Sequence, residues 1–276
     1  MPELAEVETL ARDLGRLLLN AEFSRIEVFW QRSVAVPSSA ELATHLPGRK
    51  VLNVGRRGKF LILSLTGPTY LLIHLRMSGR LHVSDGTGAP DPYARIVFHL
   101  TDGRRLTFSD VRKFGRVFWT ADLDSIVGDL GPEPLADGFT PDVLGDILNR
   151  HRGALKPLLL NQRVLAGLGN IYVDEALFAA GLHPLRKADS LSSLETGCLY
   201  TGIQRVLRQA IRNRGTTLED ASFHDAEGQP GLNAGNLQVY HRAGEPCVRC
   251  GTLVQRTVVG GRGTHLCPGC QQPERS

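Results

Sequence analysis

The sequence of 276 residues has little that is typical of secreted, membrane-spanning or disordered proteins. No apolar run approaches the roughly 20 residues that a helix needs to cross a bilayer. The first residues, Met1 to Glu6, are acidic and lack the basic and then apolar pattern of a signal sequence. No internal repeat and no long polar low-complexity tract is present. We therefore expect a soluble cytoplasmic protein with no membrane partner, long enough for one large domain or two ordinary ones.

A large excess of charge of one sign is also missing. The 32 Lys and Arg residues stand against 28 Asp and Glu residues, which gives a net charge of +4 and a pI near 8.9. This balance permits a polyanionic partner such as nucleic acid but does not require one, because an electrostatic field depends on where the charges lie. A cytosolic enzyme with no nucleic-acid partner would have the same composition.

Cysteine is scarce, and four of the five cysteines lie between residues 247 and 270. They form two C-x-x-C knuckles separated by 16 residues: Cys247 and Cys250, then Cys267 and Cys270. Two such knuckles, joined by a β-hairpin over Leu253–Val259 and the following Gly260 and Gly261, supply the four soft ligands of a tetrahedral Zn²⁺ ion. Two disulfides or a redox pair are the alternatives, which a reducing compartment disfavours. Because four thiolates close the coordination sphere, this one zinc ion would be structural.

The first half of the chain combines a helix with many short strands. Leucine and valine at spacings of three and four predict a helix over residues 3–19. Asp102 and Gly103 favour a hairpin with a type I′ turn between two of the later strands. The expected strands include Lys59–Leu65, Tyr70–Leu75, Arg95–Leu100 and Arg105–Ser109. Short strands with turn signals at this spacing predict a β-sandwich or barrel.

Helical periodicity follows a linker rich in Pro and Gly. Helices are expected near residues 141–150, 156–160, 170–180 and 192–213, and Cys198 in the last of them would be a small buried residue. Arg205, Arg208 and Arg212 share one face of this helix, most simply a solvated face. Residues 215–235 are rich in Gly and Pro and have little periodicity, so we expect a long functional loop.

A second glycine-rich segment, Gly167–Gly169, directly precedes the helix expected at Asn170. Its glycines allow close backbone approach, and the free N–H groups of a helix start suit a phosphate. Many hairpins between helices carry such glycines for packing only, so this signal alone decides nothing.

Pro2 lies directly before the first expected helix. Removal of Met1 would expose its secondary amine, and an α-amine has a pKa of roughly 7.7–8.0, far below that of lysine. The positive end of the helix would lower it further, leaving a neutral, nucleophilic fraction. Attack of this amine on a sugar C1′ would give an iminium ion, an electron sink like a lysine Schiff base. Glu3 and Glu6 follow on the first turn, where they could transfer protons or balance the iminium charge.

The same three residues also have a purely structural interpretation. Acidic residues in a first helical turn commonly cap the helix and balance its dipole, and proline is common at the first helical position. From these residues alone, capping and catalysis both stay open.

Six segments, in order along the chain, resemble the formamidopyrimidine-DNA glycosylase family. They are the start Pro2–Thr9, the paired C-x-x-C knuckles, and the internal segments Gly58–Leu61 (GKFL), His74–Gly79 (HLRMSG), Asp110–Gly115 (DVRKFG) and Gly167–Tyr172 (GLGNIY). The match covers nearly the whole chain and is specific for that reason.

The resemblance implies an α+β multidomain fold. Its parts would be a catalytic N-terminal helix with an antiparallel β-sandwich over residues 1–131, a linker over 132–140, and a helix-two-turns-helix DNA-binding domain over 141–236. The loop at 215–235 would close over a flipped lesion, with Thr216–Leu218 resembling its start. A zinc-finger hairpin would occupy residues 237–276.

The resemblance also implies a catalytic role for five residues. Pro2 matches the Schiff-base nucleophile, Glu3 the acid–base group for glycosidic cleavage and ring opening, and Glu6 a second essential carboxylate. Lys59 would contact phosphate and assist β-elimination. Arg262, at the tip of the zinc hairpin, would grip phosphates beside the lesion and take part in δ-elimination.

Further residues resemble the family's DNA contacts. Met77, Arg112 and Phe114 would fill the space left by an everted nucleotide, because a base inside a duplex is out of reach of the nucleophile. An unbranched Met, an Arg that can bond the orphaned base and an aromatic wedge suit that task. The remaining contacts would be made by His74, Tyr93, Arg152, Lys156 and Asn170.

The function implied is that of a monomeric, bifunctional DNA glycosylase and AP lyase of base excision repair. It would work in the bacterial cytoplasm, in association with the nucleoid, on double-stranded DNA that contains 8-oxoguanine, formamidopyrimidines or an abasic site. One alternative is an endonuclease VIII-like glycosylase for oxidised pyrimidines, against which Leu4, the complete wedge and the Thr216–Leu218 segment argue. The other is a non-catalytic zinc-ribbon protein that binds damaged DNA, for which the Pro2 amine would be dispensable.

Four positions depart from the usual pattern of the family or leave its details open. Ala5 replaces a second proline, Arg76 replaces a glycine beside Met77, and Tyr93 stands where some members have a histidine. Ser78 leaves the preference for a syn or anti lesion undetermined. None of these removes a catalytic group, so they bear on the lesion spectrum.

Overall fold

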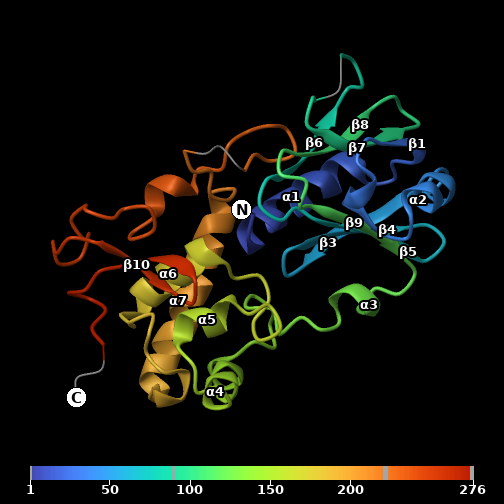
Figure 1. The fold of residues 1–276 in the computed structure, drawn as a ribbon. Helices are drawn as coiled ribbons and strands as arrows, with labels where there is room; N and C mark the ends of the chain where they lie inside the picture. Colours follow the sequence, from blue (N-terminus) through green and yellow to red (C-terminus); the bar gives the residue numbers. More distant parts are fainter. Residues whose placement is uncertain (1, 89–90, 220–222, 274–276) are drawn as a thin grey trace. The chain divides into compact units, whose positions relative to one another are not determined.

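The computed structural model describes residues 2–88, 91–219 and 223–273, which form two compact units (Figure 1). The N-terminal unit contains residues 1–129 and 211–232, and the C-terminal unit contains residues 130–210 and 233–276. Each unit is described by itself. No helix within the described ranges is long and apolar enough to cross a membrane.

The N-terminal unit is a sandwich of two sheets with a helix packed against one of them. One sheet has the strand order β1-β7-β8-β6 and the other β2-β9-β5-β4-β3. The strands are β1 (Phe23–Val28), β2 (Val34–Val36), β3 (Val51–Arg57), β4 (Phe60–Leu65), β5 (Thr69–His74), β6 (Gly79–Ser84), β7 (Ala94–Leu100), β8 (Arg105–Asp110) and β9 (Arg116–Thr120). The expected antiparallel sandwich is present, and only the short pair of β2 and β9 is parallel among the described strands. The helices are α1 (Leu4–Leu18), α2 (Ser39–His45) and α3 (Asp124–Val127).

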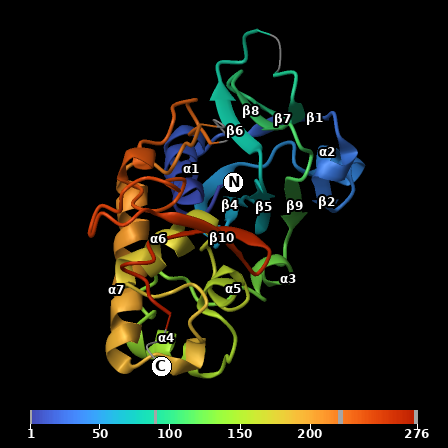
Figure 2. The same ribbon diagram turned by 60° about the vertical axis from the view of Figure 1, so that its left-hand side comes forward.

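The apolar face of α1 closes the core of this unit. Leu4, Val7, Leu10 and Leu14 are at most 1% exposed, at the spacings of three and four that predicted the helix, and Leu18 is 0% exposed. The helix packs on β3 and β4 of the N-terminal unit, whose ribbon is drawn in Figure 2. Leu10, Leu14 and Leu18 belong to a cluster of buried side chains from both sheets. Burial of these side chains fixes the orientation of α1 against the sheet and so the position of Pro2 at its N-terminal end.

The hairpin between β7 and β8 does not contain the type I′ turn expected from its sequence. A type I′ turn needs positive φ at both central residues, but only Gly103 has it, with φ of +91°. The N–H of Gly103 donates to the carbonyl of Leu100, and the N–H of Leu100 to that of Arg104. The loop therefore has three residues, Thr101 to Gly103, instead of two, and glycine occupies its last position. The N–H of Thr101 donates to the carbonyl of Glu22 on a neighbouring segment.

The C-terminal unit is helical and ends in a hairpin. Its helices are α4 (Pro141–Asn149), α5 (Leu155–Leu160), α6 (Asn170–Ala180) and α7 (Ser193–Arg212). The last two residues of α7, Ile211 and Arg212, belong to the N-terminal unit. Strands β10 (Gln255–Val259) and β11 (Arg262–Leu266) pair antiparallel. Both residues of their turn, Gly260 and Gly261, have positive φ, so the type I′ geometry occurs here.

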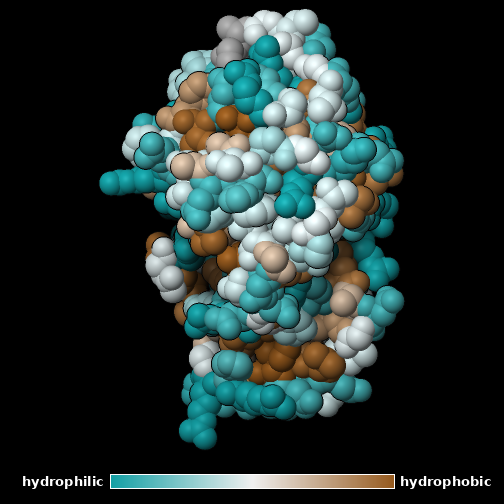
Figure 3. All heavy atoms as spheres, turned by 90° about the vertical axis from the view of Figure 1, so that its right-hand side faces the viewer, coloured by the Kyte–Doolittle hydropathy of each residue, from teal (hydrophilic) through white to brown (hydrophobic). Residues whose placement is uncertain are grey.

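The expectation that Cys198 is buried is wrong. Its side chain is exposed on α7, whereas Thr196, Leu199 and Ile203 form the buried face. Residues two or one apart on a helix point in different directions, so burial of Thr196 and Leu199 turns Cys198 outward. The predicted solvated face is confirmed, since Arg205, Arg208 and Arg212 are exposed. On the face drawn in Figure 3, hydrophilic side chains are likewise the most common.

Candidate active site

Two buried carboxylates lie at the N-terminus of α1. Glu3 and Glu6 are each 1% exposed, and Pro2 is buried beside them. The Glu3 side chain accepts from the backbone N–H of Glu6, and Glu6 Oε2 accepts from the N–H of Glu3 at 2.8 Å. The capping interpretation is therefore confirmed, and the same contacts hold both carboxylates within one turn of Pro2.

The second oxygen of Glu6 binds the segment that follows α7. Glu6 Oε1 accepts the N–H of Thr216 at 2.7 Å. Gly215, just before it, has φ of +83°, and a Cβ there would lie 2.9 Å from the Phe223 ring and 3.0 Å from Glu6 Oε1. Only glycine fits this position. The start of the expected loop at 215–235 thus lies directly on a carboxylate of the site; residues 220–222 of that loop, like Met1, are outside the described residues.

Lys59 and His74 lie at one edge of the five-stranded sheet. Lys59 is 8% exposed and forms, with Gly58, the two-residue turn between β3 and β4. Phe60, which follows it, pairs with His74 at the end of β5. Burial, as the largest cause, and the positive charges of Arg76 and Lys59 together lower the pKa of His74 to about 3.

The hydrogen bonds of His74 agree with a neutral ring. Its Nδ1 accepts the backbone N–H of Arg76 at 3.1 Å, so the ring proton belongs on Nε2. A neutral imidazole in this tautomer can donate one hydrogen bond to a phosphate oxygen but carries no charge to it.

Asp110 joins the loops that carry the expected DNA wedge. It is 0% exposed, and its Oδ1 accepts the hydroxyl of Ser78 at 2.5 Å and the N–H of Arg112 at 3.1 Å. Its Oδ2 accepts the N–H of Gly115 at 2.7 Å, and its own N–H donates to the carbonyl of Tyr93. Three loop residues are therefore bonded to this buried carboxylate, and a fourth, Tyr93, to the backbone N–H of the same residue.

The side chains held by these loops are unusually exposed for their type. Met77 is 40% exposed, Phe114 48% and Tyr93 49%, and Arg112 is exposed as well. The Arg112 guanidinium lies 5.0 Å from the centre of the Phe114 ring. Apolar side chains exposed on well-bonded loops mark a surface that meets a partner. The structure thus brings Met77, Arg112, Phe114 and Tyr93 together.

In the C-terminal unit, Asn170 and Lys156 both hold the zinc hairpin. Asn170 is the first residue of α6, and its Nδ2 donates to the carbonyl of Gly263 at 2.9 Å. Lys156 Nζ donates to the same carbonyl at 2.9 Å and to Asp174 Oδ1 at 2.6 Å. Asp174 Oδ2 accepts the N–H of His265 at 2.8 Å. Helices α5 and α6 are thereby bonded to β11.

The position of Lys156 differs from that of a surface phosphate contact. Its side chain and that of Asp174 are both 0% exposed. A direct bond to phosphate would require this buried ion pair to break, which is costly because each charge is desolvated. By contrast, Arg152 and Arg262 are exposed, the latter at the tip of the β10–β11 hairpin.

The four predicted zinc ligands form one cluster. One sulfur atom from each of Cys247, Cys250, Cys267 and Cys270 lies within 4.8 Å of the others. Gly251, with φ of +74°, follows the first knuckle and donates its N–H to the carbonyl of Cys247. Four thiolates at this separation fit a tetrahedral Zn²⁺ ion, which has no need of another ligand. The metal expected from the spacing is a structural one.

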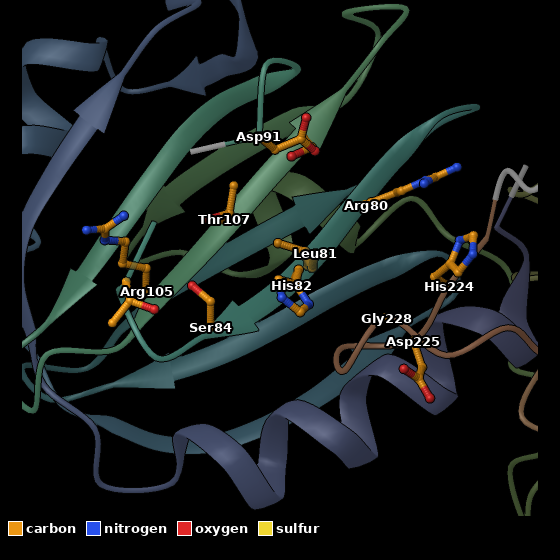
Figure 4. A pocket seen from close by; sticks show the side chains of 12 residues that line it. Arg80, Leu81, His82, Ser84, Asp91, Arg105, Thr107, His224, Asp225 and Gly228 are labelled. Carbon is orange, nitrogen blue, oxygen red and sulfur yellow. The ribbon is translucent and has the colours of Figure 1, made fainter. Parts of the chain in front are cut away.

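A pocket of about 470 Å³ lies elsewhere in the N-terminal unit. It is formed by outward side chains of β6 and β8 and by residues 224–228, with Arg105 and Arg80 at opposite ends (Figure 4). Among the described residues that line this pocket, none is predicted to be catalytic or to bind DNA. We therefore keep it separate from the candidate site.

Several residues that organise the site had no individual signal in the sequence. Asp110 opens the motif DVRKFG, but its partner Ser78 lies 32 residues away. Asp174 and Arg214 likewise form hydrogen bonds with residues far away in the sequence, His265 and Asp13 respectively. The only local sign was the position of Asp110 two residues before the N–H that it binds, which is typical of an Asx-turn.

The fold and the site define a class of protein. A β-sandwich with buried carboxylates at its N-terminal helix, exposed apolar side chains on bonded loops, a helical unit and a four-cysteine zinc finger together describe a DNA glycosylase of base excision repair.

Comparisons with known proteins identify the family. Residues 1–117 match the formamidopyrimidine-DNA glycosylase N-terminal domain, residues 130–222 its H2TH domain, and residues 244–273 the zinc finger found in FPG and IleRS. The chain belongs to the formamidopyrimidine-DNA glycosylase family. A formamidopyrimidine-DNA glycosylase from Roseiflexus sp. is 46% identical over 99% of this chain and 100% of its own length. One from Protochlamydia amoebophila is 41% identical with the same coverage.

Solved structures agree with this assignment. The MutM (FPG) protein from Thermus thermophilus has a TM-score of 0.90 and 40% identity, covering 99% of this chain and 100% of that one. The Lactococcus lactis Fpg in complex with DNA containing an abasic site has a TM-score of 0.91 and 34% identity, covering 98% and 99%. The chain is accordingly an enzyme of the family that removes oxidised purines from DNA and has the AP lyase activity of that family.

Proposed function

We propose that Pro2, once Met1 has been removed, is the nucleophile of a bifunctional glycosylase and AP lyase. The observation that carries the proposal is the buried pair of Glu3 and Glu6 within one turn of Pro2. The substrate is double-stranded DNA with 8-oxoguanine, a formamidopyrimidine or an abasic site. The enzyme acts as a monomer on the nucleoid in the bacterial cytoplasm.

The first step releases the base. The neutral Pro2 nitrogen forms a bond to C1′ while the glycosidic bond breaks, and the bonding electrons leave with the base, which takes up a proton. Glu3 gives its proton to the departing base, takes the proton that the Pro2 nitrogen loses, and passes it to the sugar ring oxygen as the ring opens. The resulting iminium is a cation, and the carboxylate of Glu6 stabilises it.

Two eliminations then cut the strand. The Glu3 carboxylate takes the C2′ proton, and the electrons of the C2′–H bond move toward the iminium to give an enamine. The enamine expels the 3′-phosphate as the C3′–O bond breaks. Loss of the C4′ proton breaks the C5′–O bond, so the 5′-phosphate leaves and a one-nucleotide gap with phosphate ends remains. Lys59 assists the first elimination and Arg262 the second, each by binding the phosphate whose negative charge develops. Water finally hydrolyses the iminium and regenerates Pro2.

Each unit contributes its own DNA contacts. In the N-terminal unit, Met77, Arg112 and Phe114 occupy the gap left by the everted nucleotide, with Tyr93 on the adjoining loop and His74 donating to phosphate as a neutral ring. In the C-terminal unit, Arg152, Asn170 and Arg262 bind phosphate. Lys156 is buried beneath these phosphate-binding residues and positions the zinc hairpin through its hydrogen bond to the carbonyl of Gly263. Contacts to phosphate dominate the affinity and make it strongly salt-dependent.

Zinc, when bound by the four cysteines, supplies folding energy to the arm that carries Arg262 and takes no part in the chemistry. The thiolates of Cys247 and Cys267, both buried, orient the two knuckles at the base of the hairpin.

Borohydride trapping tests the proposal. The full chain is mixed with a duplex that contains one 8-oxoguanine, sodium borohydride reduces any iminium, and peptide mapping locates the adduct. We expect a covalent adduct on Pro2 and loss of it in Glu3→Gln, while Glu8→Gln, a change at a partly exposed acid of α1, retains it. No adduct would contradict an enzyme that uses Pro2, as in a non-catalytic damage binder. Faster cutting of thymine glycol than of 8-oxoguanine would favour an endonuclease VIII-like substrate range.

A further inference from the structure

Arg214 lies between two buried carboxylates of the N-terminal unit. Its Nη2 atom is 2.6 Å from Asp13 Oδ2 and 2.6 Å from Asp225 Oδ2. The side chains of Asp13 and Asp225 are 0% and 3% exposed, whereas that of Arg214 is 39% exposed. Because Asp13 belongs to α1, one guanidinium joins the helix that carries Glu3 and Glu6 to the chain after α7.

Asp225 uses its other oxygen to build a tight turn. Its Oδ1 accepts the N–H groups of Glu227 at 3.0 Å and Gln229 at 2.8 Å. Burial alone would raise the pKa of Asp225, but Arg214 and these backbone donors hold it below its ordinary value. The hydrogen bond to Asp225 correspondingly raises the pKa of Arg214. The carboxylate is therefore charged, and in Figure 4 it lies beside α1.

The described parts of the loop form two arms, residues 215–219 and 223–231, which are bonded to each other and to the site. Thr216 donates its N–H to Glu6, as described above. The Thr217 hydroxyl donates to the carbonyl of Phe223 at 2.7 Å and accepts the N–H of Gly231 at 2.8 Å. The first arm is thus anchored on Glu6, and the second arm is anchored on Asp13 through Arg214.

We infer that Arg214 is a positioning residue that holds both arms of this loop on α1 and so governs recognition of the damaged base. The inference rests on the proposed function, in which the loop covers an everted lesion. An abasic site has no base to cover, so its cleavage needs Pro2 and the carboxylates but not an ordered loop. Arg214 should therefore matter for excision of 8-oxoguanine far more than for cleavage of a preformed abasic site.

The test compares both reactions in the same variants. Arg214→Gln removes the charge and keeps a similar length, Arg214→Lys keeps the charge but loses the forked geometry, and Asp225→Asn removes one partner while leaving an oxygen for the turn. Arg212→Gln is the matched control, since it removes an exposed arginine two residues away. Single-turnover rates are measured on an 8-oxoguanine duplex and on an abasic duplex, with thermal melting of each variant.

We expect Arg214→Gln and Asp225→Asn to slow 8-oxoguanine excision about tenfold or more, because small displacements at a site cost at least that much. Abasic cleavage should stay within about twofold of the parent rate, Arg214→Lys should lie between, and Arg212→Gln should match the parent. Equal losses in both reactions, or no loss in either, would overturn the inference. If Arg214→Gln does not fold, Asp225→Asn decides by the same criteria. Failure of the unmodified chain to excise 8-oxoguanine would instead count against the proposed function.

Discussion

The hydroxyl of Ser78 donates to the carboxylate of Asp110 over 2.5 Å and thereby joins the loop of Met77 to the loop of Arg112 and Phe114. The two residues lie 32 positions apart but at the same end of the β6–β8 pair, where Gly79, next to Ser78, pairs with Asp110. Exposed wedge residues gain little from packing, so their positions depend on the backbone beneath them. Asp110 supplies that support from a fully buried position.

Asp110→Asn should weaken this support. An amide can offer only one oxygen to the three groups that donate to Asp110, and its NH₂ would face a backbone N–H or the Ser78 hydroxyl. We expect a loss of about 1–3 kcal/mol in the free energy of unfolding, from an unmet buried donor. Excision of 8-oxoguanine should slow by about tenfold because the wedge is misplaced.

Urea unfolding and single-turnover kinetics measure these two effects. Asp85→Asn is a matched control, because Asp85 is exposed in the loop after β6 and accepts hydrogen bonds from Thr87 within the same loop. Parent-like kinetics for Asp110→Asn would show that the wedge does not depend on this carboxylate.

His74 should make the stability of the protein depend on pH. Its pKa is lowered to about 3 by burial and neighbouring positive charge, against 6.5 for an ordinary histidine. Between these values the unfolded chain binds a proton that the folded chain does not, so stability is lost as the pH falls from about 6.5 toward 3. His74→Gln should flatten this part of the profile. Urea unfolding at a series of pH values checks it, and an unchanged slope would argue against a neutral, buried ring.

The pair of Lys156 and Asp174 should be essential for the C-terminal unit. Lys156→Met leaves a fully buried carboxylate without its cation, for which we expect a loss of about 3–5 kcal/mol in the free energy of unfolding. The double variant Lys156→Met with Asp174→Asn removes both charges and keeps an oxygen for His265, so it should recover much of that loss. Chemical denaturation of the single and double variants measures the coupling. Additive effects would show that the two charges do not act as a pair.

Cys267→Ser should release zinc and abolish DNA binding while the N-terminal unit stays folded. Three thiolates bind the ion less well than four, and the hairpin that carries Arg262 depends on the metal for its folding. Zinc content per chain and the affinity for a duplex are the measurements. Cys198→Ser is the matched control, since Cys198 is exposed on α7 and lies outside the cluster. Unchanged DNA affinity in Cys267→Ser would mean that the hairpin does not grip DNA.

Much of the fold could be predicted because its signals are local. The leucine spacing of α1, the period-two strands and the glycine before α6 each depend on residues within one element, and the structure places those elements within a few residues of the expected bounds. The domain boundaries and the roles of the individual site residues stay predictions. The type I′ prediction at Gly103 was wrong because the loop closed by Leu100 and Arg104 has three residues rather than two, and only Gly103 has positive φ.

What the sequence by itself determined is the chemistry that neighbours in the chain can carry. Each C-x-x-C knuckle brings two thiolates together, so spacing alone identified the zinc ligands. Pro2, Glu3 and Glu6 share a helical turn, but their proposed catalytic role came from the resemblance to the family. Only the tertiary structure decided which distant residues support that chemistry. Arg214 reaches Asp13 across 201 positions and Lys156 reaches Gly263 across 107. Such contacts exist only once burial of the apolar faces has brought the elements together, because no short-range pattern specifies a partner at that separation.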